Sequence, residues 1–159
     1  MIAQILAVAV AVAASAPATI TAPQVRAFVD RQSRAWNAGD LAAYFATFTP
    51  RARFTDQALG NDNRIVPYGV STPAQARAQA RRVFATSRVR ETSVITAITI
   101  APDGASARVA DDEVSEVTKG GKVRRVCGHS VATLVLTPAG LRTTGQTDTI
   151  VRCRAGPIG

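Results

Sequence analysis

Three turn sequences divide the second half of the chain, and their spacing constrains the fold more than any other feature. Each contains glycine together with proline, aspartate or lysine, residues that reverse a chain within a few positions; the turns fall at 102–104, 119–122 and 137–140. The turns separate stretches rich in apolar and β-branched residues, at 91–100, 105–118, 123–136 and 141–153. Strands joined by such short turns pair in antiparallel order. The second half therefore predicts a four-stranded meander.

The first half contains two helix-start sequences of the same type. Thr21 and Thr72 each precede a glutamine by three residues and have a proline between the two, at Pro23 and Pro73; this pattern is typical of a capped helix with an early proline. The first helix is expected to end near Gly39. Asp40 then caps a second helix, which carries Phe48 and is expected to stop at Pro50 just beyond it. The first half is therefore mainly helical.

A short strand at 51–56 and a loop at 57–69 are expected to connect the second helix to the third, which runs to about Ala85. The chain has 159 residues, of which 47% are hydrophobic, enough for the core of one domain. Helices followed by strands predict an α+β fold in which a curved antiparallel sheet packs against the N-terminal helices.

An unbroken apolar run at 5–14 lies near the start of the chain. It is shorter than the roughly 20 residues that span a bilayer, and small residues follow it, as they do at signal-peptidase sites. We predict a signal peptide over 1–18 and a domain over 19–159, in a periplasmic or secreted protein. No basic residue precedes the run, and an uncleaved membrane-surface anchor is the alternative. No second long apolar stretch follows, so the processed protein is not expected to span a membrane.

The chain has two cysteines, Cys127 and Cys153, and one histidine, His129. These are too few ligands for a Cys/His zinc site, so no metal is expected. In an oxidising compartment the cysteines are expected to form a disulfide; two buried free thiols are the alternative. A turn centred near Ala139 places Cys127 opposite Val151, one diagonal step from Cys153. The predicted hairpin and the predicted disulfide are therefore compatible.

The net charge is +8, and none of it lies in 1–18. A basic exported protein attracts anionic lipid headgroups, anionic glycans or small carboxylates, whereas nucleic acid is not expected as a partner. A solvated arginine-rich surface without a partner is the alternative. The chain contains neither a P-loop nor a G-x-G-x-x-G sequence, so we expect no nucleotide and no other cofactor.

Residues 28–56 read FVDRQSRAWNAGDLAAYFATFTPRARFTD. The segments AWNAGDL at 35–41 and FTD at 54–56 resemble the opening of the nuclear transport factor 2-like superfamily, which includes SnoaL-like polyketide cyclases and ketosteroid isomerases. The order of the later elements agrees with this resemblance over roughly residues 22–153. The resemblance implies a cone, a bent sheet wrapped around helices with a pocket at its open end. It also implies a homodimer through the outer face of the sheet, and it leaves function open because the fold serves many activities.

Asp56 is the candidate catalytic residue. The resemblance aligns it with the general-base aspartate of ketosteroid isomerases, and a carboxylate at the mouth of an apolar pocket can transfer a proton next to a carbonyl. The alternative is an aspartate that caps a turn. The oxyanion-binding tyrosine of that family corresponds to Gln32 here, and its second acid corresponds to about Ala132. Steroid isomerase activity is therefore not expected.

Several polar or amphipathic residues are expected to lie near the cavity: Gln32, Trp36, Tyr44, Tyr68, Ser130 and Asp148. The alternative for Trp36 is a position in the packed core. Tyr68 is expected at the rim of the cavity because it lies in a loop. Only strand alternation places Asp148 near the cavity. His129 shares a face with Cys127 and is expected on the outer side of the sheet or in a dimer contact; a catalytic histidine is the alternative.

These patterns support three hypotheses. The first is an exported protein that binds a small apolar or anionic ligand in the cone pocket. The second is a lyase, isomerase or cyclase that uses Asp56 as general base. The third is a secreted interaction protein whose arginine-rich surface binds an acidic partner.

Overall fold

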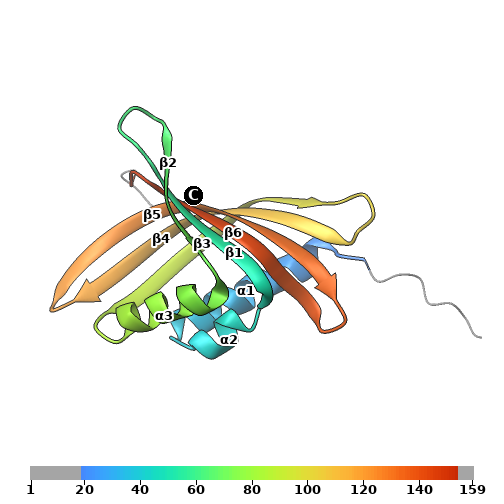
Figure 1. Ribbon diagram of the computed structural model, residues 1–159, viewed down its shortest axis with the longest axis horizontal. Helices are drawn as coiled ribbons and strands as arrows, with labels where there is room; N and C mark the ends of the chain where they lie inside the picture. The colour runs from blue at the N-terminus through green and yellow to red at the C-terminus, as the bar shows by residue number, and fades with distance from the viewer. Residues whose placement is uncertain (1–18, 154–159) are drawn as a thin grey trace, which may run out of the picture.

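The computed structural model describes residues 19–153 of the chain (Figure 1). The predicted signal peptide, 1–18, and the end of the predicted domain, 154–159, lie outside the described residues. Within the described part of the chain, no helix is long and apolar enough to cross a membrane.

The described residues form three helices and six strands, with the helices in the first half of the chain. The helices are α1 (Ala22–Asn37), α2 (Leu41–Phe45) and α3 (Pro73–Phe84). The strands are β1 (Phe48–Leu59), β2 (Ile65–Ser71), β3 (Arg88–Ile100), β4 (Ser106–Lys119), β5 (Lys122–Thr137) and β6 (Gly140–Val151). The α+β class and the four-stranded meander are confirmed.

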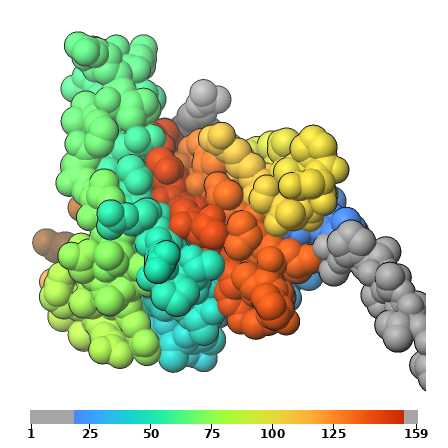
Figure 2. All heavy atoms as spheres, turned by 45° about the vertical axis from the view of Figure 1, so that its right-hand side comes forward, coloured from blue at the N-terminus to red at the C-terminus, as the bar shows by residue number. Residues whose placement is uncertain are grey.

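All six strands belong to one curved sheet in the order β2-β1-β6-β5-β4-β3. Neighbouring strands are antiparallel except β1 and β6, which run parallel. The helices cover one side of the sheet (Figure 1), so the sheet wraps around them as the predicted cone requires. The β1–β2 hairpin projects from the body as a separate lobe (Figure 2).

Both predicted helix starts are confirmed in atomic detail. The Thr21 hydroxyl accepts a hydrogen bond from the Gln24 backbone, and the Gln24 side chain accepts one from the Thr21 backbone. Thr72 and Gln75 repeat the same reciprocal pair. Each pair satisfies backbone groups that a helix end otherwise leaves unbonded.

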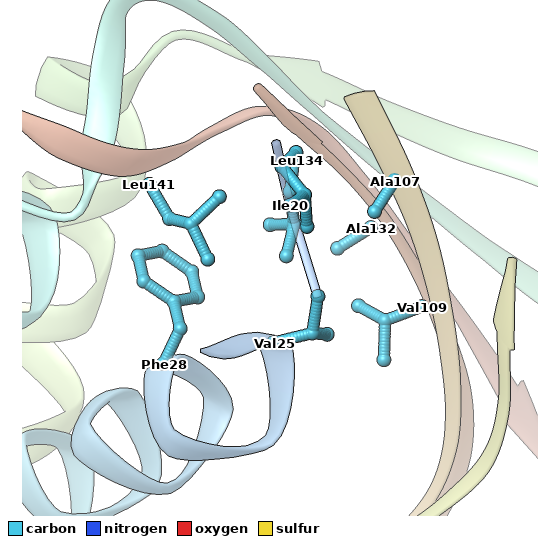
Figure 3. Packing of buried hydrophobic residues seen from close by; sticks show 8 residues of the cluster. All are labelled: Ile20, Val25, Phe28, Ala107, Val109, Ala132, Leu134 and Leu141. Carbon is cyan, nitrogen blue, oxygen red and sulfur yellow. The ribbon is translucent and has the colours of Figure 1, made fainter. Parts of the chain in front are cut away.

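The main core lies between α1 and the concave face of the meander (Figure 3). Val25 and Phe28 on α1 are 0% and 1% exposed, and they point toward residues of β4, β5 and β6. The buried members of this cluster are Ile20, Val25, Phe28, Ala107, Val109, Ala132, Leu134 and Leu141. This packing joins α1 to the meander through close-packed apolar side chains.

A second, aromatic cluster lies beneath α2 and α3. Its buried members are Phe48, Ala52 and Phe54 on β1, and Tyr44 and Phe45 pack against them. The rings of Phe48 and Phe54 have centroids 4.6 Å apart. The two clusters pack against different parts of the sheet. The larger cavity described below lies beside the second cluster.

Two boundaries differ from the sequence prediction. Phe48 was expected on the second helix but begins β1, because the Thr47 carbonyl accepts a hydrogen bond from the Thr143 backbone and the chain joins β6. The expected loop at 57–69 is largely the β1–β2 hairpin, with a turn closed by a hydrogen bond from Gly60 N–H to the Arg64 carbonyl. Its glycine, asparagine and proline content suggested a loop, but β2 is an edge strand, where proline is tolerated.

The predicted hairpin register and disulfide are both present. Cys127 pairs with Val151 across β5 and β6. Cys153 follows two residues later and is bonded to Cys127, with the two Cα atoms 5.1 Å apart. This bridge ties the residues just beyond β6 to the neighbouring strand β5.

Candidate functional site

A cavity of about 250 Å³ lies between the helices and the concave face of the sheet. Its lining combines an apolar aromatic wall from the helices with a polar wall from the strands. The lining residues are Trp36, Tyr44, Phe45, Phe54, Asp56, Ser71, Ala76, Gln79, Ala80, Val83, Glu91, Glu113, Gln146 and Asp148. A smaller cavity of about 40 Å³ lies deeper in the cone and shares several of these residues. The cone therefore contains open space beside its packed core.

One transverse row of the sheet carries three carboxyl groups on the cavity side. Asp56 on β1 pairs with Asp148 on β6. Asp148 pairs with Ser130 on β5, and Ser130 pairs with Asp111 on β4. Asp56 and Asp148 line the larger cavity, whereas Ser130 and Asp111 line the smaller one. Sheet register thus aligns acidic side chains from strands that are far apart in sequence.

Two glutamates, Glu91 and Glu113, add carboxyl groups from the strands β3 and β4. Together with Asp56, Asp111 and Asp148 they form what we call the acidic wall. Glu91 on β3 accepts a hydrogen bond from the Ser115 hydroxyl at 2.8 Å. Glu113 on β4 lies opposite Gly128, where an added Cβ would be 3.6 Å from the Glu113 Oε2 atom.

Burial raises the pKa of every carboxyl in this wall. The pKa of Asp148 rises to about 6 through burial, although hydrogen bonds from Gln146 and Ser130 counteract the rise. Burial brings the pKa of Glu91 to about 7. Burial, together with the charges of Glu91 and Asp148, brings the pKa of Glu113 to about 10. Burial also raises the pKa of Asp56 and Asp111. The wall therefore contains acids that ionise over a wide pH range.

The aromatic wall centres on Trp36. Its ring centroid lies 4.9 Å from that of Tyr44 and 5.0 Å from that of Phe84. Burial, with added repulsion from Asp148, raises the pKa of the Tyr44 phenol well above its ordinary value, so it stays protonated. The Trp36 Nε1 atom and the Ser71 Oγ atom are buried and have no hydrogen-bond partner. Both residues line the larger cavity.

The structure gathers most of the predicted site residues around these cavities. Asp56, Trp36 and Tyr44 line the larger one. Ser130 and Gln32 line the smaller one, and the Gln32 amide donates hydrogen bonds to the Thr47 and Thr143 hydroxyl groups. Gln32 therefore has a structural role in joining α1 to the sheet.

Tyr68 is placed differently from the other candidates. It lies on the projecting strand β2, is 59% exposed and does not line the cavity. Its pKa is raised, mainly by partial burial and then by the charge of Asp56, and the next residue, Gly69, pairs with Asp56 across β1 and β2. His129 lies outside the cavities, as expected, and pairs with the exposed Asp112 at 2.9 Å.

Glu91, Asp111, Glu113 and Gln146 complete the polar wall, and none was singled out from the sequence. Strand alternation could have found two of them, because the inward positions Ala107 and Val109 continue to Asp111 and Glu113. Among residues 19–153, no group of three His, Cys, Asp or Glu side chains is arranged to hold a metal ion.

No protein-family model and no curated protein matches the sequence. Solved structures match over most of the chain. A conserved protein from Planctomyces limnophilus has a TM-score of 0.67 at 17% identity, covering 81% of this chain and 94% of its own. A ketosteroid isomerase-like protein from Erwinia carotovora atroseptica has a TM-score of 0.63 at 16% identity, covering 82% and 96%.

An NTF2-like protein with a cystatin-like fold from Novosphingobium aromaticivorans is also similar, with a TM-score of 0.59 at 16% identity over 84% of this chain and 83% of its own. The chain has the fold of the nuclear transport factor 2-like proteins. The fold expected from the segment 28–56 is therefore confirmed, and at these identities the likeness extends to the fold alone.

Proposed function

We propose that this protein binds a small, partly apolar molecule in the cavity of its cone. The observation that carries the proposal is a cavity of about 250 Å³ with an aromatic wall facing a polar wall. An empty apolar cavity of about 150 Å³ holds benzene, so there is room for one ring with a short substituent. Apolar walls with a few convergent polar groups are typical of small-molecule sites.

The lining favours a neutral or cationic ligand over an anionic one. Asp56, Glu91, Glu113 and Asp148 line the cavity, and an anion there would meet carboxyl oxygens. An anionic ligand, which the sequence had also suggested, is therefore not part of the proposal.

Filling the cavity tests the binding proposal. Ala80 on α3 is 7% exposed and lines the cavity, so Ala80→Phe is expected to occupy the space of a ligand. Ala76→Leu is a milder second variant from the same helix, and Ala78→Phe is the matched control because Ala78 is exposed. Chemical shifts of cavity residues are followed while small aromatic probes are added. Binding that survives in both cavity variants would contradict the proposal.

A second candidate function is proton transfer in a lyase, isomerase or cyclase reaction, with Asp56 as general base. Asp56 lines the cavity beside Asp148, and the raised pKa of both groups supports this role, because neighbouring acids with different pKa values can divide acid and base tasks. Asp56→Asn is expected to abolish turnover of an identified substrate while retaining binding. Asp62→Asn, in the exposed β1–β2 turn, is the control.

We further propose that the chain is exported and works as a homodimer. The Cys127–Cys153 disulfide supports an oxidising compartment. Exposed apolar side chains on β2, including Val66 at 53% and Val70 at 63%, support contact with a second copy. Light scattering of the purified chain tests the dimer, and fractionation of expressing cells tests the location. A monomer at all concentrations would contradict the dimer.

An acidic partner for the arginine-rich surface remains a separate proposal. Arginines on α1 and α3, such as Arg26, Arg31 and Arg81, are exposed. Binding through such a surface should weaken as salt is added, because exposed charges are screened. Binding of vesicles with anionic lipids that is insensitive to salt would contradict it.

A further inference from the structure

The charge inside the cone is opposite in sign to the charge of the whole chain. The chain carries a net charge of +8, yet none of the described residues that line either cavity is lysine, arginine or histidine. Four carboxyl groups line the larger cavity and a fifth, that of Asp111, lines the smaller one. The cavity is thus an acidic interior within a basic protein.

These carboxyl groups disfavour one another's ionisation, because their negative charges repel. Asp148 and Asp111 both disfavour ionisation of Glu113, and Asp56 disfavours ionisation of Asp148. Ionised groups buried without a counter-charge are costly, and no lining side chain supplies one. A cation in the cavity would relieve this repulsion and let the acids ionise.

Two further groups lack the partners that buried polar atoms normally have. Ser71 is 5% exposed, and its Oγ atom is buried, unbonded and part of the cavity lining. The Trp36 Nε1–H group on the opposite wall is also buried and unbonded. More than about nine in ten buried polar groups are hydrogen-bonded in proteins. These two groups therefore point to a ligand that offers them polar atoms.

The spacing of the acids and the nature of the opposite wall distinguish an organic cation from a metal ion. Within residues 19–153 the acids do not form a group that could coordinate a metal. Across from them, Trp36, Tyr44 and Phe45 present aromatic rings. Aromatic rings bind ammonium groups through their faces and apolar groups through contact area.

We propose that the ligand is a small organic amine, with its ammonium group against the acidic wall and its apolar body against the aromatic wall. This inference rests on the proposed ligand-binding function and specifies the class of molecule. The ammonium group is placed between Asp148, Glu113 and Asp56. A hydroxyl or carbonyl group on the same molecule would bond Ser71 and Trp36.

The test uses amines paired with alcohols of the same skeleton: butylamine, cyclohexylamine and 2-phenylethylamine, each with its alcohol. Binding to the full processed chain is measured by calorimetry and by chemical shifts of cavity residues. At least one amine is expected to bind about tenfold or more tightly than its alcohol. Asp148→Asn and Glu113→Gln should remove this preference, whereas the exposed Glu116→Gln on the same strand as Glu113 should not.

Each other outcome overturns a defined part of the proposal. If the alcohols bind as tightly as the amines, the amine inference is wrong while the ligand-binding function stands. If Ca²⁺ or Mn²⁺ binds at the acidic wall and the amines do not, the site is a metal site and the inference is again wrong. If neither amines nor alcohols bind, and Ala80→Phe does not alter the binding of the small aromatic probes, the ligand-binding function fails as well.

Discussion

Asp56 and Asp148 lie opposite each other on the parallel strands β1 and β6, and both side chains line the same cavity. Burial is the main reason that the pKa of Asp148 rises to about 6, and the neighbouring charge of Asp56 adds to the rise. The two carboxyls therefore titrate as interacting groups rather than independently.

Replacing Asp56 should lower the pKa of its neighbour. In Asp56→Asn the pKa of Asp148 is expected to fall below about 6, because one repelling charge is removed, and to stay above the ordinary aspartate value because burial remains. Carboxyl-carbon NMR titration measures this directly. Asp62→Asn, in the exposed turn of the β1–β2 hairpin, should leave the titration of Asp148 unchanged. An unchanged Asp148 in Asp56→Asn would show that the two groups do not interact.

The acidic wall should make the protein less stable as the pH rises. The pKa of Glu113 is about 10 in the folded protein and 4.5 in the reference state, so the folded state holds its proton more strongly. Stability is then greatest below pH 4.5 with respect to this group, and it declines between pH 4.5 and 10. Each such group contributes at most about 1.4 kcal/mol per pH unit, and the contributions of Glu91, Asp111, Asp148 and Asp56, whose pKa values are also raised, add to that of Glu113.

Glu113→Gln isolates this effect because it removes the ionisable group and keeps the shape. The variant is expected to be more stable than the parent at pH 8, and the difference should shrink toward pH 5. Urea unfolding at several pH values gives the free energies. Glu116→Gln is the matched control on the exposed side of β4. A difference that grows toward low pH would have the wrong sign.

Breaking the disulfide should reduce stability without changing the fold. A Cys127→Ala/Cys153→Ala variant is expected to lose about 2–4 kcal/mol of unfolding free energy, because the unfolded chain is no longer constrained. Guanidinium unfolding measures the loss. Reducing agent should bring the parent to the level of the variant and leave the variant unaffected. Equal stability of parent and variant under oxidising conditions would contradict a constraining role.

Gly104 should tolerate a side chain less well than Gly120, although both have positive φ values of 68° and 54°. A Cβ at Gly104 would lie 2.7 Å from the Cβ of Thr19, whereas a Cβ at Gly120 meets nothing within 4 Å. Both alanine variants incur about 1–2 kcal/mol for the left-handed backbone. Gly104→Ala should lose more, through the clash with Thr19. Thermal unfolding of the two variants gives the difference, and equal losses would show that Thr19 moves aside.

The sequence predicted the elements whose cause is local. Thr21 and Thr72 each bond a backbone group three residues away, so their helix starts can be recognised in any context. The three glycine-containing turns act over similarly short distances and define the meander. The Cys127–Val151 register followed from the position of one turn. The prediction failed at Phe48, which pairs with the distant Thr143 in the sheet, where the Thr143 backbone N–H donates a hydrogen bond to the Thr47 carbonyl.

The candidate site could be predicted only in part. Asp56, Trp36 and Tyr44 were found because they lie in the one segment that resembles a known family, and Ser130 and Asp148 because strands alternate. Glu91 and Glu113 were missed, since charged residues on a strand ordinarily face solvent. Their burial depends on which strands flank them and on how strongly the sheet bends.

Sequence alone determined the α+β class, both capping boxes, the meander and the pairing of the cysteines, because each depends on residues close together in the chain or across one turn. Tertiary structure decided that β1 runs parallel to β6, and this pairing brings Asp56 beside Asp148. It also decided that carboxyl groups from four strands share one cavity. Such a site depends on the register and curvature of the whole sheet, and these arise from the packing of distant residues rather than from local preference.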